Sequence, residues 1–391
     1  MTRSFPTGFR WGAATSAHQT EGGNVNSDWW RIEQYPGIGL EHCGDAVDSY
    51  HRYEEDMRLL AESGLDHYRF SVEWARIEPL EGELSRAQLM HYRRMIDTAL
   101  RLGVKPVVTL HHFSHPQWFA DRGGWPAPKA GDAFVSYVER VAEILEDVEW
   151  VCTINEPNLV SITEAMTQRG REGDTSYTPG QLPAPDEGIG RILVDAHKSA
   201  VAVLRERTGA KVGWTVAQQA FVAAPACEET HRQVQYVWED QYLEAARGDD
   251  FVGVQSYTSQ LVDENGPVPH PDDPGNTLMG WAYRPDALGI ALRNAWEVTG
   301  GMPLLVTENG IATGDDERRI AYTREALGHL LDAVADGVDV RGYLHWSLLD
   351  NFEWGHWAPT FGLVAVDRDT FERRPKPSLA WLGSIARANA L

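Results

Sequence analysis

Eight short, apolar and β-branched runs alternate with longer amphipathic stretches along this chain of 391 residues, and this alternation limits the folds that it can adopt. Continuous apolar strands separated by helices are typical of a parallel sheet covered by helices. The predicted strands are residues 8–14, 66–72, 105–110, 150–154, 211–216, 251–255, 303–307 and 340–346. The predicted helices include residues 48–62, 87–102, 130–146, 188–207 and 316–335.

This strand count matches a closed (β/α)8 barrel of the α/β class, and we expect residues 1–391 to form one such domain. A doubly wound open sheet is the alternative, but it usually has a glycine-rich phosphate-binding turn after its first strand. Here residues 11–14, Trp-Gly-Ala-Ala, lead into Thr-Ser-Ala-His-Gln instead. The proline- and glycine-rich segments 177–188 and 265–280 are predicted to be long loops inside the domain.

Charge and hydropathy exclude several classes of partner. The chain has 35 basic and 57 acidic residues, a net charge of −22, so we expect neither nucleic acid nor a membrane surface as a partner. No apolar run is long enough to cross a bilayer, and the first six residues lack the apolar core of a signal peptide, which predicts a cytoplasmic protein. Cys43, Cys152 and Cys227 are too scattered for a disulfide framework or a metal site, and Cys152 is predicted to lie in the core.

Two glutamates stand where predicted strands end. Glu156 lies in Thr-Ile-Asn-Glu-Pro-Asn at residues 153–158, and Glu308 lies in Val-Thr-Glu-Asn-Gly at residues 306–310. A single glutamate at such a position is usually only solvated. A pair of carboxyl groups, however, is what glycoside hydrolysis requires: one protonates the leaving oxygen and the other attacks the anomeric carbon.

Seven of the eight predicted strands are followed by polar or aromatic residues, and in a (β/α)8 barrel the carboxyl ends of the strands form the active site. We therefore expect one large polar pocket. The candidates are Gln19, Arg69, His111, His112, Asn155, Glu156, Tyr257, Glu308, Trp346, Glu353 and Trp354.

Tryptophan is abundant, with 15 residues, and several stand beside polar neighbours as in sugar-stacking sites. Core filling is the alternative for each single tryptophan. The group from Trp346 to Trp357 favours sugar stacking most, and the other candidates are Trp29 and Trp30.

Five segments resemble the motifs of glycoside hydrolase family 1, the retaining β-glucosidases and β-galactosidases. These are residues 9–22, 68–76, 153–157, 306–310 and 346–354, within a similarity that extends from Phe5 to about Trp381. The resemblance implies a retaining β-glycosidase that acts on a small-molecule β-glycoside or a short oligosaccharide and needs no cofactor.

Individual roles follow from the same resemblance. It implies that Glu156 is the acid/base and Glu308 the nucleophile, and that Arg69 and Tyr257 hold the nucleophile in place. The implied sugar-binding residues are Gln19, His112, Asn155, Trp346, Glu353 and Trp354.

The physical chemistry agrees with these implied roles. A guanidinium and a phenol beside Glu308 favour its charged form, and that charge raises the pKa of Glu156. Once Glu308 is esterified its charge is gone, so Glu156 loses its proton more readily and can act as a base toward water. Asn155 is expected to hydrogen-bond the sugar 2-hydroxyl. An ordinary salt bridge for Arg69 and a loop cap for Asn155 are the alternatives.

Several positions depart from the family pattern. Gln255 stands where the family usually has Asn, Phe113 stands where Trp is usual, and the segment 238–251 is short. The residues after Trp354 also lack the usual Lys-Arg pair. Glu353 places a carboxylate where a sugar 6-phosphate would be repelled, so a non-phosphorylated sugar is predicted.

Three other functions compete with hydrolysis of a β-glycoside. One is glycosyl transfer to, or tailoring of, a bulky glycoside in specialised metabolism. A second is a catalytically silent sugar-binding protein, although both carboxyls are present. A metal-dependent hydrolase is the third: His111, His112 and His115 form a cluster, but adjacent strand residues point to opposite faces and no further ligand set follows, so no metal is expected.

Overall fold

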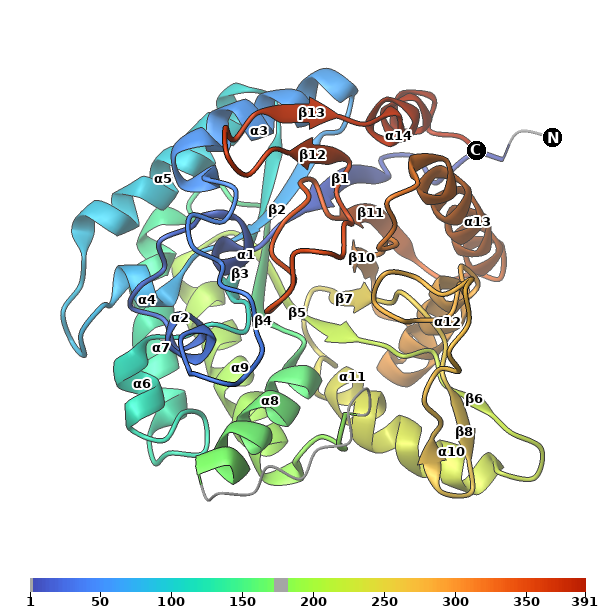
Figure 1. The fold of residues 1–391 in the computed structure, drawn as a ribbon, viewed down its shortest axis with the longest axis horizontal. Helices are drawn as coiled ribbons and strands as arrows, with labels where there is room; N and C mark the ends of the chain where they lie inside the picture. The colour runs from blue at the N-terminus through green and yellow to red at the C-terminus, as the bar shows by residue number, and fades with distance from the viewer. Residues whose placement is uncertain (1–2, 172–181) are drawn as a thin grey trace.

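A closed ring of parallel strands surrounded by helices forms the protein in the computed structural model, which describes residues 3–171 and 182–391 (Figure 1). The order of strands around the ring is β1-β11-β10-β7-β5-β4-β3-β2. The strands are β1 (Arg10–Ala14), β2 (His67–Ser71), β3 (Lys105–His111), β4 (Trp150–Asn155), β5 (Lys211–Ala217), β7 (Val252–Gln255), β10 (Leu304–Glu308) and β11 (Val340–Trp346). The predicted (β/α)8 barrel is confirmed, and each strand begins and ends within two residues of its predicted range.

Helices cover the outside of the ring (Figure 1), among them α5 (Arg86–Arg101), which packs an apolar face inward. In α5, the residues Leu89, Tyr92, Ile96 and Ala99 are buried at the three- and four-residue spacing of one helix face. The five predicted helices are confirmed as α3 (Ser49–Ser63), α5 (Arg86–Arg101), α7 (Ala130–Val141), α9 (Glu187–Arg207) and α13 (Asp316–Ala335).

Helix α8 (Pro157–Arg171) was not predicted, although it matters most for the site because it begins directly after Glu156. The short segment before β7 is helical: a π-helical turn at Tyr236–Asp240 continues into α11 (Gln241–Ala245). The chain therefore reaches β7 without a long loop.

The two predicted loops have different outcomes. Of the segment 177–188, the first five residues lie outside the described part of the chain, and the last two belong to α9. The segment 265–280 contains a short strand, β9 (Gly266–Pro267), which pairs with β8 (Leu261–Asp263). With β6 (Val222–Ala223) these strands form a small sheet outside the barrel, seen beside α10 (Glu228–Gln235) in Figure 1.

The barrel interior is filled by apolar side chains at the end away from the site. Cys152 packs there with Val107, Trp150 and Leu344, which confirms its predicted place in the core. All three cysteines are free and buried. Among the described residues, no helix is both long and apolar enough to cross a membrane.

At Gly12 the backbone of β2 lies close to β1. A Cβ atom there would lie 2.1 Å from the carbonyl oxygen of His67, so a larger residue would push two paired strands apart. Gly328 offers a contrast, because it lies inside α13 with no atom within 4 Å of the place that its Cβ would take.

We expect Gly12→Ala to lower the free energy of unfolding by about 2 kcal/mol or more, because the clash is with backbone. The matched variant Gly328→Ala should leave it unchanged or raise it by roughly 0.5–1 kcal/mol, because alanine favours a helix interior. Urea denaturation followed by circular dichroism measures both. Equal stability of the two variants would contradict the close β1–β2 approach.

Candidate active site

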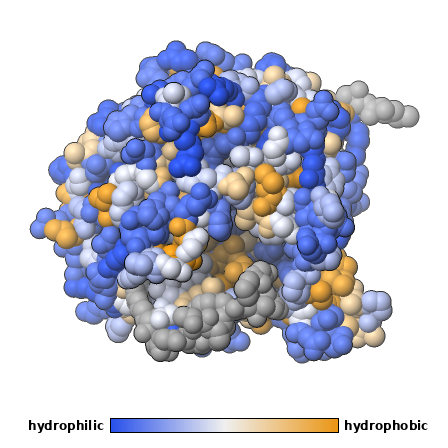
Figure 2. All heavy atoms as spheres, in the orientation of Figure 1, coloured by the Kyte–Doolittle hydropathy of each residue, from blue (hydrophilic) through white to orange (hydrophobic). Residues whose placement is uncertain are grey.

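A cavity of about 380 Å³ opens at the carboxyl ends of the barrel strands. Figure 2 shows a hollow in this face of the molecule, with apolar residues visible inside it. Arg69 and Asn155 lie in the wall just behind the cavity, with exposed fractions of 0% and 1%. Eight further candidates line the cavity: Gln19, His112, Glu156, Tyr257, Glu308, Trp346, Glu353 and Trp354. His111, the eleventh, does not: its ring packs against Trp125 and Phe134 instead.

Glu308, the last residue of β10, is held at both carboxyl oxygens. Arg69 donates through Nη1 to Oε1 at 2.5 Å, and the hydroxyl of Tyr257 donates to Oε2 at 2.5 Å. Burial raises the pKa of Glu308, while the Arg69 charge and the Tyr257 hydroxyl oppose the increase because they stabilise the carboxylate. Both donors also fix the orientation of the carboxyl group.

Glu156 follows the last residue of β4, and neither Arg69 nor Tyr257 donates to it. Burial raises the pKa of Glu156 well above its usual value, and the charge of Glu308 raises it further, against the opposing effect of Arg69. Of the two carboxyls, Glu308 is therefore the one that ionises first, and Glu156 is the one that keeps its proton. This unequal pair can supply a nucleophile and a proton donor in one cavity.

Three residues of the cavity wall have left-handed backbone conformations that side chains other than glycine seldom adopt. The φ angles are 64° at Phe113, 47° at Glu156 and 46° at Trp354. The Glu156 amide donates to the carbonyl oxygen of Thr215 at 2.8 Å, and Pro157 begins α8 directly afterwards. Strained backbone of this kind gathers at functional sites, where the surrounding structure holds it in place.

Asn155 has its amide orientation fixed by three donors. Its Oδ1 accepts from Arg69 Nη2 at 2.6 Å, from Gln255 Nε2 at 2.9 Å and from Thr215 Oγ1 at 3.1 Å. Its buried Nδ2 has no partner among the described residues, so it is free to donate to a bound molecule. Gln255, the longer residue noted in the sequence, thus serves as one of the three donors that orient Asn155.

Glu353 is the third carboxyl of the cavity, and it accepts from two predicted sugar-binding residues. Trp346 donates through Nε1 to Oε1 at 3.2 Å, and Gln19 donates through Nε2 to Oε2 at 3.1 Å. Burial raises the pKa of Glu353 well above its usual value, despite the Trp346 hydrogen bond. The three side chains present fixed donors and acceptors to hydroxyl groups at this end of the cavity.

Aromatic rings stack beside this polar end. The ring of His112 is nearly parallel to those of Trp346 and Trp354, at centroid distances of 5.8 and 6.1 Å. Burial and the charge of Arg69 lower the pKa of His112 well below its usual value, so its ring stays neutral. Of the other tryptophans proposed for sugar stacking, Trp29 also lines the cavity, whereas Trp357 donates to the backbone of His42 away from it.

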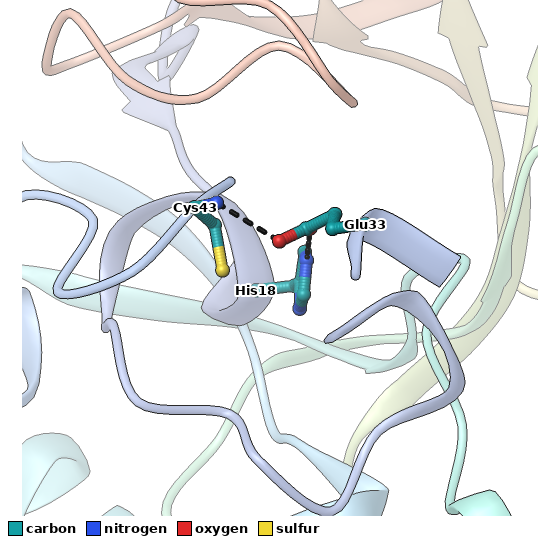
Figure 3. Close-up of side chains that lie close together, drawn as sticks. All are labelled: His18, Glu33 and Cys43. Atoms are coloured by element: carbon teal, nitrogen blue, oxygen red, sulfur yellow. Dashed lines mark hydrogen bonds and ion pairs between the residues drawn. The ribbon is translucent and has the colours of Figure 1, made fainter. Parts of the chain in front are cut away.

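A buried group behind Trp354 consists of His18, Glu33 and Cys43 (Figure 3). His18 Nε2 lies 2.8 Å from Glu33 Oε1, and Glu33 Oε2 accepts from the backbone amide of Cys43 at 2.9 Å. Although burial alone would lower it, hydrogen bonds to Cys43 and Glu33 raise the pKa of His18 to about 10. The ring of His18 is nearly parallel to the indole of Trp354, with ring centroids 5.6 Å apart and an angle of 9° between the planes.

This group is the one set of three candidate ligands within 4.8 Å of one another that the described residues contain. Donor atoms around tetrahedral zinc lie roughly 3.3 Å apart for nitrogen and oxygen ligands at about 2.0–2.1 Å. The 2.8 Å contact between His18 and Glu33 is a direct hydrogen bond instead. The group packs behind Trp354 as a hydrogen-bonded cluster.

One wall of the cavity was missed in the sequence. It consists mainly of Leu159 and Ile162 on α8, Gln218 directly after β5, and Met279 and Trp281 from the loop before α12 (Ala287–Thr299). Strand five was the one predicted strand without a polar candidate at its end, and Gln218 supplies it. The position of Gln218 directly after strand five was enough to predict it as a site residue. The α8 residues could not be predicted in this way, because the helix itself was not predicted.

The family model described as glycosyl hydrolase family 1 matches residues 1–244 and 229–391. β-Glucosidase A of Acetivibrio thermocellus is 31% identical over 453 aligned positions, which cover 99% of each chain. This alignment is longer than the 391 residues of the chain, so the chain lacks segments that the relative has.

The chain is also similar to solved structures of β-glycosidases. The crystal structure of β-glycosidase BGL167 is 42% identical, with a TM-score of 0.89 and coverage of 99% of this chain and 98% of that one. The family 1 β-glucosidase of Thermotoga maritima in complex with isofagomine lactam is 28% identical, with a TM-score of 0.90 and full coverage of both chains.

Proposed function

We propose that this chain, which belongs to glycosyl hydrolase family 1, hydrolyses non-phosphorylated β-glycosides by double displacement, with Glu308 as nucleophile and Glu156 as general acid/base. Membership of the family makes it an O-glycosyl hydrolase of the β-glycosidase type. We assign the two roles because the two carboxyl groups have different environments. Arg69 and Tyr257 donate to the two oxygens of Glu308, and neither donates to Glu156.

In the first step, Glu308 attacks the anomeric carbon while Glu156 gives its proton to the leaving oxygen. The ester that forms removes the negative charge of Glu308, and with it one cause of the raised pKa of Glu156. Glu156 then takes a proton from water, which attacks the anomeric carbon and releases Glu308. Asn155 Nδ2, unpartnered in the wall behind the pair, is suited to donate to the sugar 2-oxygen.

The preference for a non-phosphorylated sugar rests on the partners that a phosphate would need. Glu353, Gln19 and Trp346 form the polar end of the cavity, and none of these side chains offers a phosphate a positive charge. None of the described residues that line the cavity is a lysine or an arginine. A small-molecule β-glycoside therefore suits the site.

Replacing the nucleophile tests the mechanism. Glu308→Gln should lower kcat/KM for aryl β-glycosides by roughly four to six orders of magnitude, because no covalent intermediate can form. The control is Glu297→Gln on the exposed surface of α12, which should retain full activity.

The stereochemistry of the product gives an independent check on double displacement. Proton NMR of a reaction in progress should show the β-anomer of the sugar before mutarotation. If the α-anomer appeared first, or if Glu308→Gln retained its activity, the assignment of Glu308 would be wrong.

Removing the hydroxyl of Tyr257 tests the electrostatics of the pair. That hydroxyl stabilises the charged form of Glu308, so Tyr257→Phe should raise the pKa of Glu308. Because the reaction needs ionised Glu308, the acid limb of the kcat/KM–pH profile should move to higher pH. The exposed Tyr236→Phe serves as the control, and an acid limb that stayed in place or moved to lower pH would contradict the role of Tyr257.

A further inference from the structure

We infer that the leaving group of the substrate is an apolar or aromatic group with one hydrogen-bonding substituent, and that Gln218 binds that substituent. This inference rests on the proposed function, because Glu156 as proton donor defines where the leaving group lies.

The wall beside Glu156 is formed by α8, which begins at the next residue. Leu159, Ile162 and Thr163 line the cavity at three, six and seven residues after Glu156, so they lie on one face of the helix. A leaving group whose oxygen receives the proton of Glu156 must extend along this face. The polar end with Glu353 belongs to other elements, namely the loop after β11 and α1 (Ala17–Thr20).

Gln218 lies on the same side, directly after β5, and its side chain has no hydrogen-bond partner among residues 3–171 and 182–391. It lines the cavity with an exposed fraction of 2%, and neither Nε2 nor Oε1 is bonded within this described part of the chain. Burying a primary amide without partners costs free energy, so such groups are rare in native proteins and point to a ligand or an ordered water. The amide offers both a donor and an acceptor to a bound molecule.

The backbone around Gln218 is fixed on both sides. The backbone N–H of Gln218 donates to the carbonyl oxygen of Gln255 at 2.7 Å, and the backbone N–H of Gln219 donates to the carboxyl group of buried Glu239 at 2.6 Å. Asn158 Nδ2 also donates to the carbonyl oxygen of Ala217 at 2.8 Å. The main chain therefore cannot move to give the Gln218 side chain a protein partner, and the amide is preorganised for a ligand.

The rest of this wall favours an apolar group over a second sugar. The hydroxyls of Thr163 and Thr258 already donate to backbone carbonyls, at 3.1 and 2.9 Å. Apart from Gln218 and the half-buried Gln219, the described side chains that border the space are mainly large and apolar: Phe113, Leu159, Ile162, Met279 and Trp281. A sugar would bring several hydroxyls into a wall that offers them few partners, whereas an aryl group needs none.

Two aryl β-glycosides that differ in one hydroxyl test the role of Gln218. First, 4-nitrophenyl glycosides identify the sugar that the wild-type enzyme hydrolyses fastest. With that sugar, the 4-hydroxymethylphenyl glycoside should exceed the 4-methylphenyl glycoside in kcat/KM by about 5- to 20-fold, the worth of one buried hydrogen bond. In Gln218→Leu and Gln218→Met this ratio should fall to about one. The 4-hydroxymethylphenyl glycoside should also exceed the β-1,4-linked disaccharide.

The surface variant Gln233→Leu is the matched control and should keep the wild-type ratio, and thermal melting checks that each variant is folded. A ratio that persisted in both Gln218 variants would overturn the role of Gln218. A disaccharide hydrolysed faster than both aryl glycosides would overturn the apolar leaving group. Failure of the wild type to hydrolyse any 4-nitrophenyl glycoside would instead overturn the proposed function, so the two failures are distinct.

Discussion

The buried guanidinium of Arg69 is the interaction on which both the barrel and the site depend. It has no exposed surface, and it projects from β2 to bond Thr109 on β3, Asn155 on β4 and Glu308 on β10. A charge in such a place is tolerated only when it is fully paired, so all three partners must be held at the right distance. The strands that bring them together therefore also determine which carboxyl of the cavity is ionised.

The cavity has two chemically different halves that meet at the carboxyl pair. On one side, Gln19, Trp346 and Glu353 form a network of side chains that bond one another and supply donors and acceptors for hydroxyls. On the other side, α8 supplies apolar side chains, and Gln218 supplies a buried amide without a partner among the described residues. In the proposed mechanism the scissile bond lies at this boundary, where Glu156 and Glu308 line the cavity between the two halves.

The sequence predicted the site residues at strand ends. It did not predict the residues whose place in the site depends on the position of a neighbouring helix or loop. The apolar strands could be placed within two residues, and barrel geometry then brought Arg69, Asn155 and Glu308 together although they are far apart in the chain. The group of His18, Glu33 and Cys43 could not be found in this way. His18 lies on the short helix α1 and Glu33 ends the short helix α2 (Asp28–Glu33), while Cys43 lies in a loop. Their meeting depends on the loops that join these short elements, which carry no periodic signal.

Ring closure has a consequence for how the protein is made. Arg10 of β1 pairs with Gly342 of β11, so nearly the whole chain must leave the ribosome before the last pair of strands can form. Until then the growing sheet keeps two open edges of apolar strands, which are templates for pairing with other chains. No partly synthesised chain contains the finished cavity, and the yield of active protein therefore depends on how well those edges are protected during translation.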